Sequence, residues 1–375
     1  LARQEYDGPN ALVASLIPQC NATYFPYGRA SFERIRKHKQ FWKDNSRHIA
    51  NTVEMDIDHQ MFLRPPRWGK SLFIDMLACY LDHKAAKKFD VLFGDTEIVT
   101  KGYELKHRNQ FHVILFDLSV DVGNCDSDQL MVRLEESIRK SVQRFCSNYD
   151  LCFDDSLSAL GAFKSAIWQV EDEKMGKVFV LIDEYDRFAN KLIFEQPDTY
   201  NKVVSGRSGD AFSSPVRSFF ECIKGLPNVR SFTVGLSPIA LADASSANFV
   251  DDITDVRAVG DLLGLTEGDV RYALHKIFGL QVAIDPLVDL VKRFYNGYHY
   301  RSDSASGLTC PLYHTQLCLY FFRELCRDPE FRCKAISGTV KVEDMTDSNT
   351  RIGENVINLL IRQREMAGII CQLHA

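Results

Sequence analysis

The chain has 375 residues, with 45 lysines and arginines against 50 aspartates and glutamates, so its formal net charge is −5. This balance excludes a protein that binds nucleic acid through its overall charge, although a local basic patch is compatible with it. No apolar stretch is long enough to span a bilayer, and the first residues do not resemble a secretory signal. We therefore expect an intracellular protein, cytoplasmic or nuclear, without membrane contact.

Residues 1–24 are expected to form a loosely ordered N-terminal lead-in. From residue 25 to about residue 250, apolar runs of strand length alternate with helical patterns, which is typical of an α/β architecture. The continuous apolar run Val178–Ile182 indicates a strand buried on both faces of a parallel sheet. The strand candidates are Met61–Leu63, Phe111–Phe116, Lys177–Ile182 and Ser231–Leu236. The helix candidates cover residues 72–81, 130–145 and 216–224.

The segment 196–216 is rich in Ser, Gly, Asp and Pro, and it is predicted to be a long exposed loop. After about residue 250 the pattern becomes mostly helical, so we expect a separate C-terminal region from 251 to 375. Thr266 precedes Glu267 and Asp269, and it is predicted to be the N-cap of a helix with acidic residues in its first turn.

Eleven cysteines are present, and none of them forms a Cys-x-x-Cys pair. Four follow one another at intervals of seven or eight residues, which places them near one face of a helix. These are Cys310, Cys318, Cys326 and Cys333. We favour buried free thiols in a reducing compartment. The alternative is a metal site that includes His299 or His314, and the lack of tighter cysteine pairs counts against it.

The segment Arg64–Ser71, Arg-Pro-Pro-Arg-Trp-Gly-Lys-Ser, follows a short apolar strand and precedes an amphipathic helix. A phosphate-binding loop requires this context. Gly69 lets the backbone approach phosphates, and the helix N-terminus directs free amides and its positive dipole end at them. Lys70 is expected to reach the β- and γ-phosphates of ATP, and the Ser71 hydroxyl is expected to join the shell of Mg²⁺.

This loop departs from the pattern G-x-x-x-x-G-K-[ST], because Arg64 stands at the first glycine. Pro65 and Pro66 also lack the amide hydrogens that could bind phosphate. Gly-Lys-Ser alone is a weak signal, for which a plain helix start is the favoured interpretation. The residues expected to bind the nucleotide are Arg67, Trp68, Gly69, Lys70, Ser71 and Leu72.

The segment Lys177–Asp186 is a hydrophobic strand that ends in two consecutive acids. Asp183 is expected to hold Mg²⁺ together with Ser71, and Glu184 to polarise the water that attacks the γ-phosphate. Ligands of open α/β sheets bind at the carboxyl ends of the strands, so both motifs are predicted to converge. The alternative is an acidic turn after a buried strand. The combination with Gly-Lys-Ser favours a nucleotide site.

A third strand, Arg230–Leu236, is followed by Ser237 and Pro238. Ser237 is a candidate catalytic residue whose hydroxyl would sense the γ-phosphate. A strand that ends in a Ser-Pro turn is the alternative for this segment.

Together these motifs resemble the AAA-ATPase-like family of P-loop ATPases, which are often fused to a PD-(D/E)XK nuclease domain and have related modules in Crinkler-type effectors. The family's loop R-P-R-R-F-G-K-S is similar to residues 64–71 and also lacks the first glycine. Residues 181–186 resemble its acidic strand end, and residues 234–237 its Thr-Gly-Val-Ser segment. Weaker similarities cover 26–32, 43–46, 113–119, 263–267 and 294–298, with Asn45 at the lysine of the family's Asp-Lys-Thr element.

The resemblance implies an α/β P-loop NTPase core of the additional-strand (ASCE) type over residues 25–250, with a central, mostly parallel sheet. It implies a helical, winged-helix-like region over residues 251–375, with ATP and Mg²⁺ as ligands. We find no Asp…Glu-x-Lys arrangement after residue 320, so no nuclease activity is expected in this chain.

The leading hypothesis is an ATPase that hydrolyses ATP slowly, with a conformational output to the C-terminal region. One alternative is a non-catalytic, nucleotide-gated module for a protein partner or a homo-oligomer. Another is the ATPase part of a nucleic-acid-acting system. The basic cluster Arg34–Lys43 would serve the latter, but the net charge does not support it, and a solvated helix face is the favoured interpretation of this cluster.

Overall fold

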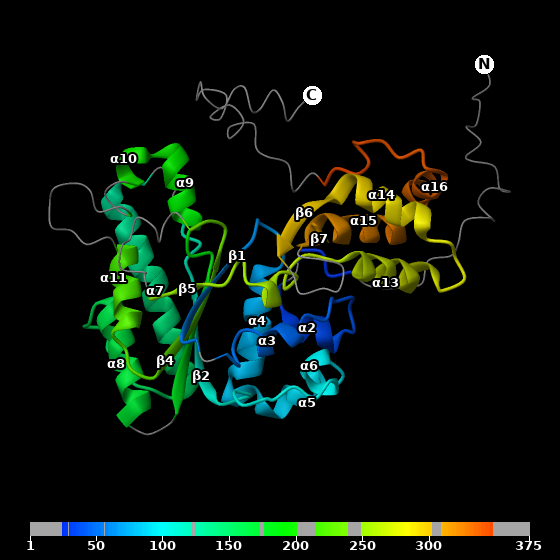
Figure 1. Cartoon of the computed structure of the whole chain (residues 1–375). Coiled ribbons are helices and arrows are strands. Elements are labelled where there is room, and N and C mark those ends of the chain that lie inside the picture. The colour runs from blue at the N-terminus through cyan, green and yellow to red at the C-terminus, as the bar shows by residue number, and fades with distance from the viewer. Residues whose placement is uncertain are drawn as a thin grey trace, which may run out of the picture. The chain divides into compact units, whose positions relative to one another are not determined.

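The computed structural model describes residues 25–28, 30–55, 57–121, 123, 125–172, 176–200, 204, 215–238, 249–301 and 309–347. The predicted lead-in at 1–24 lies outside the described residues. The described residues form two compact units (Figure 1). The larger unit takes residues 25–270 and 296–316, and the smaller unit takes residues 271–295 and 317–347. The domain boundary at residue 250 stays a prediction.

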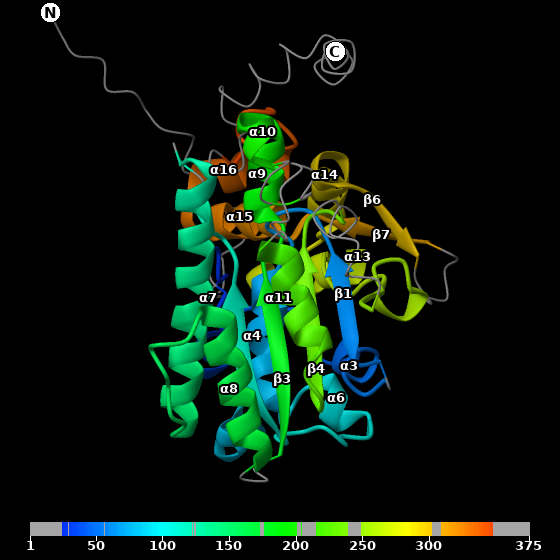
Figure 2. The same cartoon turned by 90° about the vertical axis from the view of Figure 1, so that its left-hand side faces the viewer.

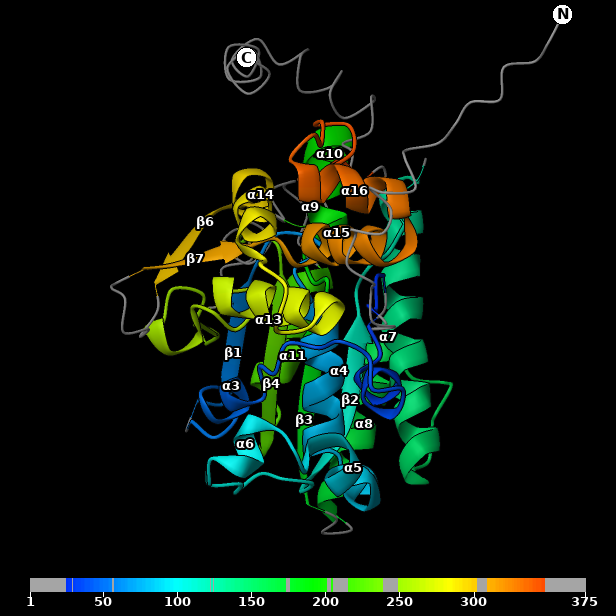
Figure 3. The same ribbon diagram turned by 90° about the vertical axis from the view of Figure 1, so that its right-hand side faces the viewer.

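A five-stranded parallel sheet forms the centre of the larger unit, in the order β2-β3-β4-β1-β5. Figure 3 shows β1, β4, β3 and β2 side by side in this order. The strands are β1 His59–Leu63, β2 Phe111–Asp117, β3 Lys177–Asp183, β4 Val229–Gly235 and β5 Asp251–Asp252. Because β4 lies between the strand of Gly-Lys-Ser and the strand of the acids, the predicted additional-strand arrangement is confirmed.

Side chains of β1, β2, β3 and β4 alternate between two hydrophobic clusters on opposite faces of this sheet, as strand geometry requires. In β3, Val178, Val180 and Ile182 belong to the cluster on one face. Phe179 and Leu181 belong to the cluster on the other face. The continuous apolar run of β3 is therefore explained, since both of its faces are covered by helices (Figure 1).

The first face is covered by α7 Ser127–Tyr149, α8 Ala159–Asp172, α9 Arg187–Glu195 and α11 Pro215–Lys224. The second face carries α2 Phe32–Lys37, α3 Arg47–Ala50, α4 Lys70–Leu81, the 3-10 helix η1 His83–Lys88, α5 Phe89–Phe93 and α6 Glu97–Thr100. Figure 2 shows α7 and α8 in front of the sheet, seen from the first face. All three predicted helices exist, and each begins earlier than its apolar pattern.

The prediction of a loop over 196–216 is wrong at its start, because α10 covers Pro197–Tyr200. The aromatic ring of Tyr200 is 8% exposed and packs into the core on the first face, which overrides the polar composition of the segment. Most of the rest of this segment lies outside the described residues.

The mostly helical pattern predicted after residue 250 is interrupted by an antiparallel hairpin in the larger unit. It consists of β6 Asn296–Arg301 and β7 Thr309–Tyr313. Between β5 and this hairpin lie the 3-10 helix η3 Arg257–Val259 and the start of α13 Glu267–Phe278. The Thr266 hydroxyl accepts the N–H of Asp269 at 3.2 Å, so the predicted N-cap is confirmed.

The smaller unit is helical in the part that the structure describes. It contains the end of α13, α14 Asp285–Tyr295, most of α15 Thr315–Arg327, and α16 Pro329–Ser337. Cys318 on α15 is buried, Cys326 and Cys333 are half-buried, and none of the three is in a disulfide. Within the described residues, no helix is long and apolar enough to cross a membrane.

Candidate functional site

The segment Arg64–Ser71 joins the carboxyl end of β1 to α4. Gly69 has a φ of 102° and Arg67 a φ of 65°, both in the left-handed region. This conformation is free of strain for glycine, whereas it costs energy for arginine, and such strain is typical of functional sites. Gly69 is also the N-cap of α4 and provides no capping side chain, so the first turn of the helix keeps amides available to a ligand.

Lys70 closes this loop on itself. Its ammonium donates hydrogen bonds to the carbonyl oxygens of Arg64 at 2.9 Å and of Pro65 at 3.1 Å. The side chain is buried, and this burial lowers the pKa of Lys70 while the carboxylates of Glu184 and Asp183 oppose the shift. The lysine therefore lies between the start of the loop and the acids after β3.

Ser71 and Asp183 are brought together, although 112 residues separate them. Burial raises the pKa of Asp183, a hydrogen bond with Ser71 lowers it, and the nearby Asp117 raises it again. One carboxylate oxygen of Asp183, Oδ1, is buried and has no hydrogen-bond partner among the described residues. A buried carboxylate oxygen without a partner is costly in a structural role, so it is available to a cation, a water or a donor from a ligand.

Glu184 follows directly, with a φ of 52°. Burial raises the pKa of Glu184, and Lys70 is the main group that lowers it. Asp117 lies opposite Asp183 in the register of β2 and β3, so acidic groups gather at the carboxyl ends of both strands. Carboxylates with raised pKa values in a cluster of this kind are candidates for general-base chemistry.

Asp186 is a buried anchor that the sequence analysis missed. Its carboxylate accepts the N–H groups of Leu236 at 3.0 Å and Ser237 at 2.6 Å, and the amide of Asn190 at 2.7 Å. The Tyr185 hydroxyl donates to the Ser237 carbonyl, and the Ser237 hydroxyl donates to Asn190 Oδ1 at 2.9 Å. The turn after β3 therefore fixes the segment after β4, and the only signal for it was the third acid in Asp-Glu-Tyr-Asp.

Arg64, at the position of the missing glycine, is a buried structural residue with only 1% of its surface exposed. Its guanidinium donates to the carbonyls of Leu63 at 2.8 Å and Gly260 at 3.0 Å. It also stacks on the rings of Phe62 and Tyr300, at 4.2 and 3.8 Å from their centroids. Burial lowers the pKa of Arg64 to about 10, which leaves it charged at neutral pH.

Trp68 packs its side chain against the hairpin. Its ring meets those of Tyr298, Tyr300 and His314 edge-on, at centroid distances of 4.8, 5.8 and 5.6 Å. A Cβ at Gly264 would lie 2.4 Å from this ring, so a larger residue does not fit there. A role of Trp68 in nucleotide binding would therefore involve its backbone, whereas Arg67 is exposed and Leu72 is half-buried.

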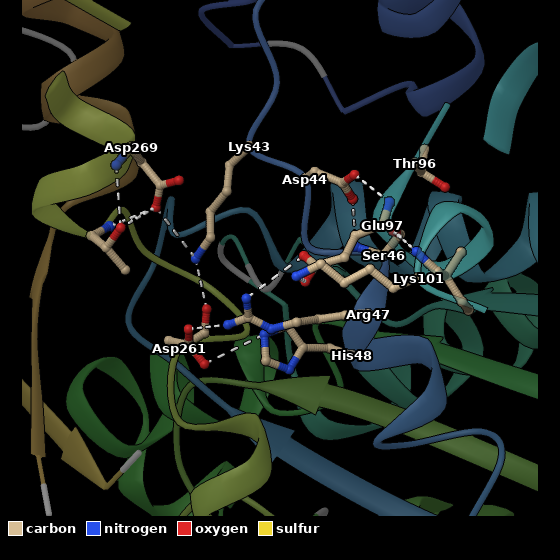
Figure 4. A network of polar contacts seen from close by, with 12 residues as sticks. Lys43, Asp44, Ser46, Arg47, His48, Thr96, Glu97, Lys101, Asp261 and Asp269 are labelled. Atoms are coloured by element: carbon tan, nitrogen blue, oxygen red, sulfur yellow. Dashed lines mark hydrogen bonds and ion pairs between the residues drawn. The ribbon is translucent and has the colours of Figure 1, made fainter. Parts of the chain in front are cut away.

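Residues 258–265, which we call the strap, support Arg64 and Trp68, and the segment 43–51 holds the strap in turn (Figure 4). Lys43 donates to the carbonyls of Asp261 at 2.7 Å and Gly264 at 2.9 Å. Arg47 pairs with the Asp261 carboxylate, and His48 Nδ1 contacts the Ala258 carbonyl at 3.1 Å. Asn45, at the family's lysine position, donates to the Leu262 carbonyl at 3.2 Å.

The charges of this network are fixed by its surroundings. Burial lowers the pKa of His48 to about 3, so the imidazole is neutral. Burial acts to raise the pKa of Asp261, but the cations Lys43 and Arg47 hold it below its ordinary value. Elsewhere in the basic cluster Arg34–Lys43, Arg36 pairs with Asp95. Much of the charge in this cluster therefore serves contacts within the chain.

Comparison of the chain with known proteins finds one matching family model and several distantly similar solved structures. The family model described as "Predicted AAA-ATPase" matches residues 26–245. No curated protein matches the chain. Among solved structures, a Walker-type ATPase of Pyrococcus abyssi is 14% identical, with a TM-score of 0.40, over 85% of this chain and 74% of that one.

Two ORC proteins of Aeropyrum pernix are similarly distant. The ORC2 protein, solved with ADPNP and ADP, is 11% identical with a TM-score of 0.38, over 93% of this chain and 74% of that one. The ORC1 protein, solved with DNA, is 10% identical with a TM-score of 0.36, over 86% of this chain and 66% of that one. The assignment of the chain rests on its strand order and on the family match.

Arg64→Ala is expected to lower the free energy of unfolding by about 2–4 kcal/mol, because it leaves buried carbonyls without their donor and removes the stacked cation. Arg67→Ala is the matched control, since Arg67 is exposed, and it is expected to change stability by less than about 0.5 kcal/mol. Urea unfolding measures both. Similar changes in the two variants would contradict the structural role of Arg64.

Asp183→Asn is expected to raise the melting temperature of the nucleotide-free protein at neutral pH. Because the pKa of Asp183 is raised in the folded state, its ionised form is disfavoured there, and this penalty grows as the pH rises through the folded-state pKa. The stabilisation should therefore be present at pH 7 and absent at a pH below the ordinary carboxylate range. A variant that melts below wild type at pH 7 would contradict this account.

Proposed function

We propose that this chain, which belongs to the AAA-ATPase-like family, binds Mg-ATP at residues 64–72 and hydrolyses ATP slowly. The observation that carries the proposal is the convergence of Lys70, Ser71, Asp183 and Glu184 at the carboxyl ends of β1 and β3. Family membership supports nucleotide binding in general, and this convergence supports the assignment of the individual residues.

Lys70 and the first turn of α4 would bind the phosphates. The Lys70 ammonium would leave the carbonyl oxygens of Arg64 and Pro65 and bind phosphate oxygens instead. Phosphate oxygens carry a full negative charge, whereas the two carbonyl oxygens carry only partial charges, so the new hydrogen bonds would be stronger. Since Pro65 and Pro66 have no N–H, the backbone donors would come from the later part of the loop, from Arg67 to Leu72.

Ser71 and Asp183 fit a magnesium ion, because they already contact each other and Asp183 keeps a buried oxygen without a partner. Bound there, the ion would neutralise charge on the phosphates. The described residues contain no group of three His, Cys, Asp or Glu side chains placed to hold a metal. Mg²⁺ with one carboxylate commonly completes its shell with phosphate oxygens and water, so the nucleotide and the ion would bind together.

Glu184 would accept a proton from the attacking water, and for this it must be ionised. Its raised pKa makes it a stronger base than an exposed glutamate. Ser237 would contact the γ-phosphate only after its hydroxyl leaves Asn190. We infer that this loss of the Ser237–Asn190 hydrogen bond, in the segment after β4, is one part of the conformational change that nucleotide binding would cause.

The other part would pass through the strap, which contacts Arg64 and leads directly into α13. A protein partner, a second copy of the chain and nucleic acid stay predicted partners, and an intracellular location stays a prediction. A module that binds ATP without turnover is the alternative function, and the experiment below separates the two.

Lys70→Ala is expected to weaken Mg-ATP binding by at least about tenfold, because the main cation for the phosphates is lost. Glu184→Gln is expected to keep binding and to lower turnover by about 100-fold. Calorimetry measures binding, and phosphate release under single-turnover conditions measures hydrolysis. Lys87→Ala, a change of an exposed lysine on η1, is the control that should match wild type in both.

Unchanged ATP binding in Lys70→Ala would contradict the proposed phosphate loop. Unchanged hydrolysis in Glu184→Gln would contradict the proposed base. Tight binding by wild type together with no turnover would favour the nucleotide-gated module.

A further inference from the structure

The outer edge of β2 lies in a groove of the larger unit, on residues that the nucleotide site does not use. β2 is the first strand in the sheet order, and no further strand pairs with its outer side among the described residues, where Asp82 forms an isolated parallel bridge with Phe111. The groove has a volume of about 400 Å³ and is lined by β2, the end of α4, η1 and α7. Figure 3 shows β2 between α4 and α7.

The hydrogen bonds of β2 show which of its backbone groups point outward. The Leu118 N–H donates to the Asp183 carbonyl at the end of β3. The backbone N–H and C=O groups of the even-numbered residues of this segment therefore point toward β3. The backbone N–H and C=O groups of the odd-numbered residues point away from the sheet. The Val113 N–H donates to the Tyr149 hydroxyl at 2.9 Å, and the Asp117 carbonyl accepts the Ser137 hydroxyl at 2.9 Å.

Leu115 lies between these two closed positions. No hydrogen bond to its outward N–H or C=O is present in the part of the chain that the structure describes, and its side chain is 45% exposed. An edge strand with an open N–H and C=O is a template for another extended chain. Tyr149 and Ser137 limit this template to a short stretch around Leu115.

The lining favours an acidic ligand. Arg144 on α7 is exposed, and within the described residues it has no ion pair. Lys84 and Lys88 also line the groove, but both are paired within the chain, Lys84 with Asp150 and Lys88 with Glu33. Arg144 is therefore the lining cation that an acidic ligand would meet. The two acids of the groove are engaged within the chain, since Glu33 pairs with Lys88 and Asp82 caps the first turn of η1.

Apolar side chains supply another part of the surface of the groove. Ala78 and Cys79 of α4, Leu92 of α5 and Phe145 of α7 line the groove beside Leu115. A ligand that combines an extended backbone, apolar side chains and a negative charge matches all three features of the groove.

We propose that this groove binds an extended, acidic peptide segment of a partner protein as an added strand beside β2. A carbonyl of the peptide accepts the Leu115 N–H, and an N–H of the peptide donates to the Leu115 carbonyl. An apolar side chain of the peptide covers Leu115, and an acidic side chain pairs with Arg144. This proposal is independent of the proposed ATPase activity, because none of its residues lies in the nucleotide site.

The test uses the full chain and a displayed library of extended peptides, of about eight residues each. Selection is expected to enrich peptides in which apolar residues alternate with others and at least one acid is present. Fluorescence anisotropy then measures the affinity of the best peptide. N-methylation of the peptide amide that faces Leu115 should weaken binding by at least about tenfold, whereas methylation of an adjacent, outward amide should not.

Variants of the protein test the same contacts from the other side. Leu115→Pro removes the outward N–H but leaves the bonds to β3, since proline is tolerated at the open side of an edge strand. Arg144→Glu reverses the charge on an exposed helix position. Each is expected to weaken peptide binding by at least about tenfold, whereas Leu115→Ala, which keeps the N–H, should have a smaller effect.

Three results would overturn the proposal. They are the absence of any enriched peptide, equal affinity of wild type and Arg144→Glu for the selected peptide, and equal effects of the two N-methylated peptides. Dimerisation of the chain that Arg144→Glu abolishes, without peptide binding, would assign the edge to a second copy and would also overturn it. The methylated peptides keep the test valid if Leu115→Pro fails to fold.

Discussion

The buried guanidinium of Arg64 connects the loop of residues 64–71 to the rest of the larger unit. A loop with two prolines and no first glycine has few backbone donors of its own, so its shape has to be stabilised from outside. Arg64 does this through hydrogen bonds to the carbonyls of Leu63 and Gly260 and by stacking between two aromatic rings. Burying a cation is costly, and these contacts offset that cost only as long as they all persist.

The strap extends this dependence across the sequence. Residues 258–265 touch Arg64 and Trp68 and are held by the segment 43–51, which lies more than two hundred residues earlier. Lys70 donates a hydrogen bond to the Arg64 carbonyl, and the Arg64 guanidinium donates one to Gly260, so Arg64 joins Lys70 to the strap. Under the proposed function, a phosphate that displaced Lys70 from this carbonyl would change the environment of Arg64. The strap, which contacts Arg64, would then transmit the conformational change.

The sequence predicted the features that depend on local pattern. The buried strands β1, β2, β3 and β4, the helix after Gly-Lys-Ser and the cap at Thr266 follow from apolar periodicity and from short-range hydrogen bonding. The strand order, with β4 between β1 and β3, came from the resemblance to the family. These parts are predictable because each rests on a few neighbouring residues or on a shared motif.

Contacts between distant segments explain what the sequence did not predict. In the sequence Arg64 is only the residue at the position of the missing glycine, and its burial depends on Gly260 and Tyr300, which no local pattern connects to it. The hairpin of β6 and β7 is stabilised by its packing on Trp68. Asp186 looked like one more acid, and its role became visible only when the segment after β4 lay beside it.

The most direct test of the central claim is a calorimetric titration of wild type with ATP, ADP and AMP, each in the presence of Mg²⁺. If the loop of residues 64–71 binds the β- and γ-phosphates, ATP and ADP should bind at one site and AMP at least about tenfold more weakly. Equal affinity for ATP and AMP, or no binding of ATP, would contradict the claim that Lys70 and the N-terminus of α4 form a phosphate site.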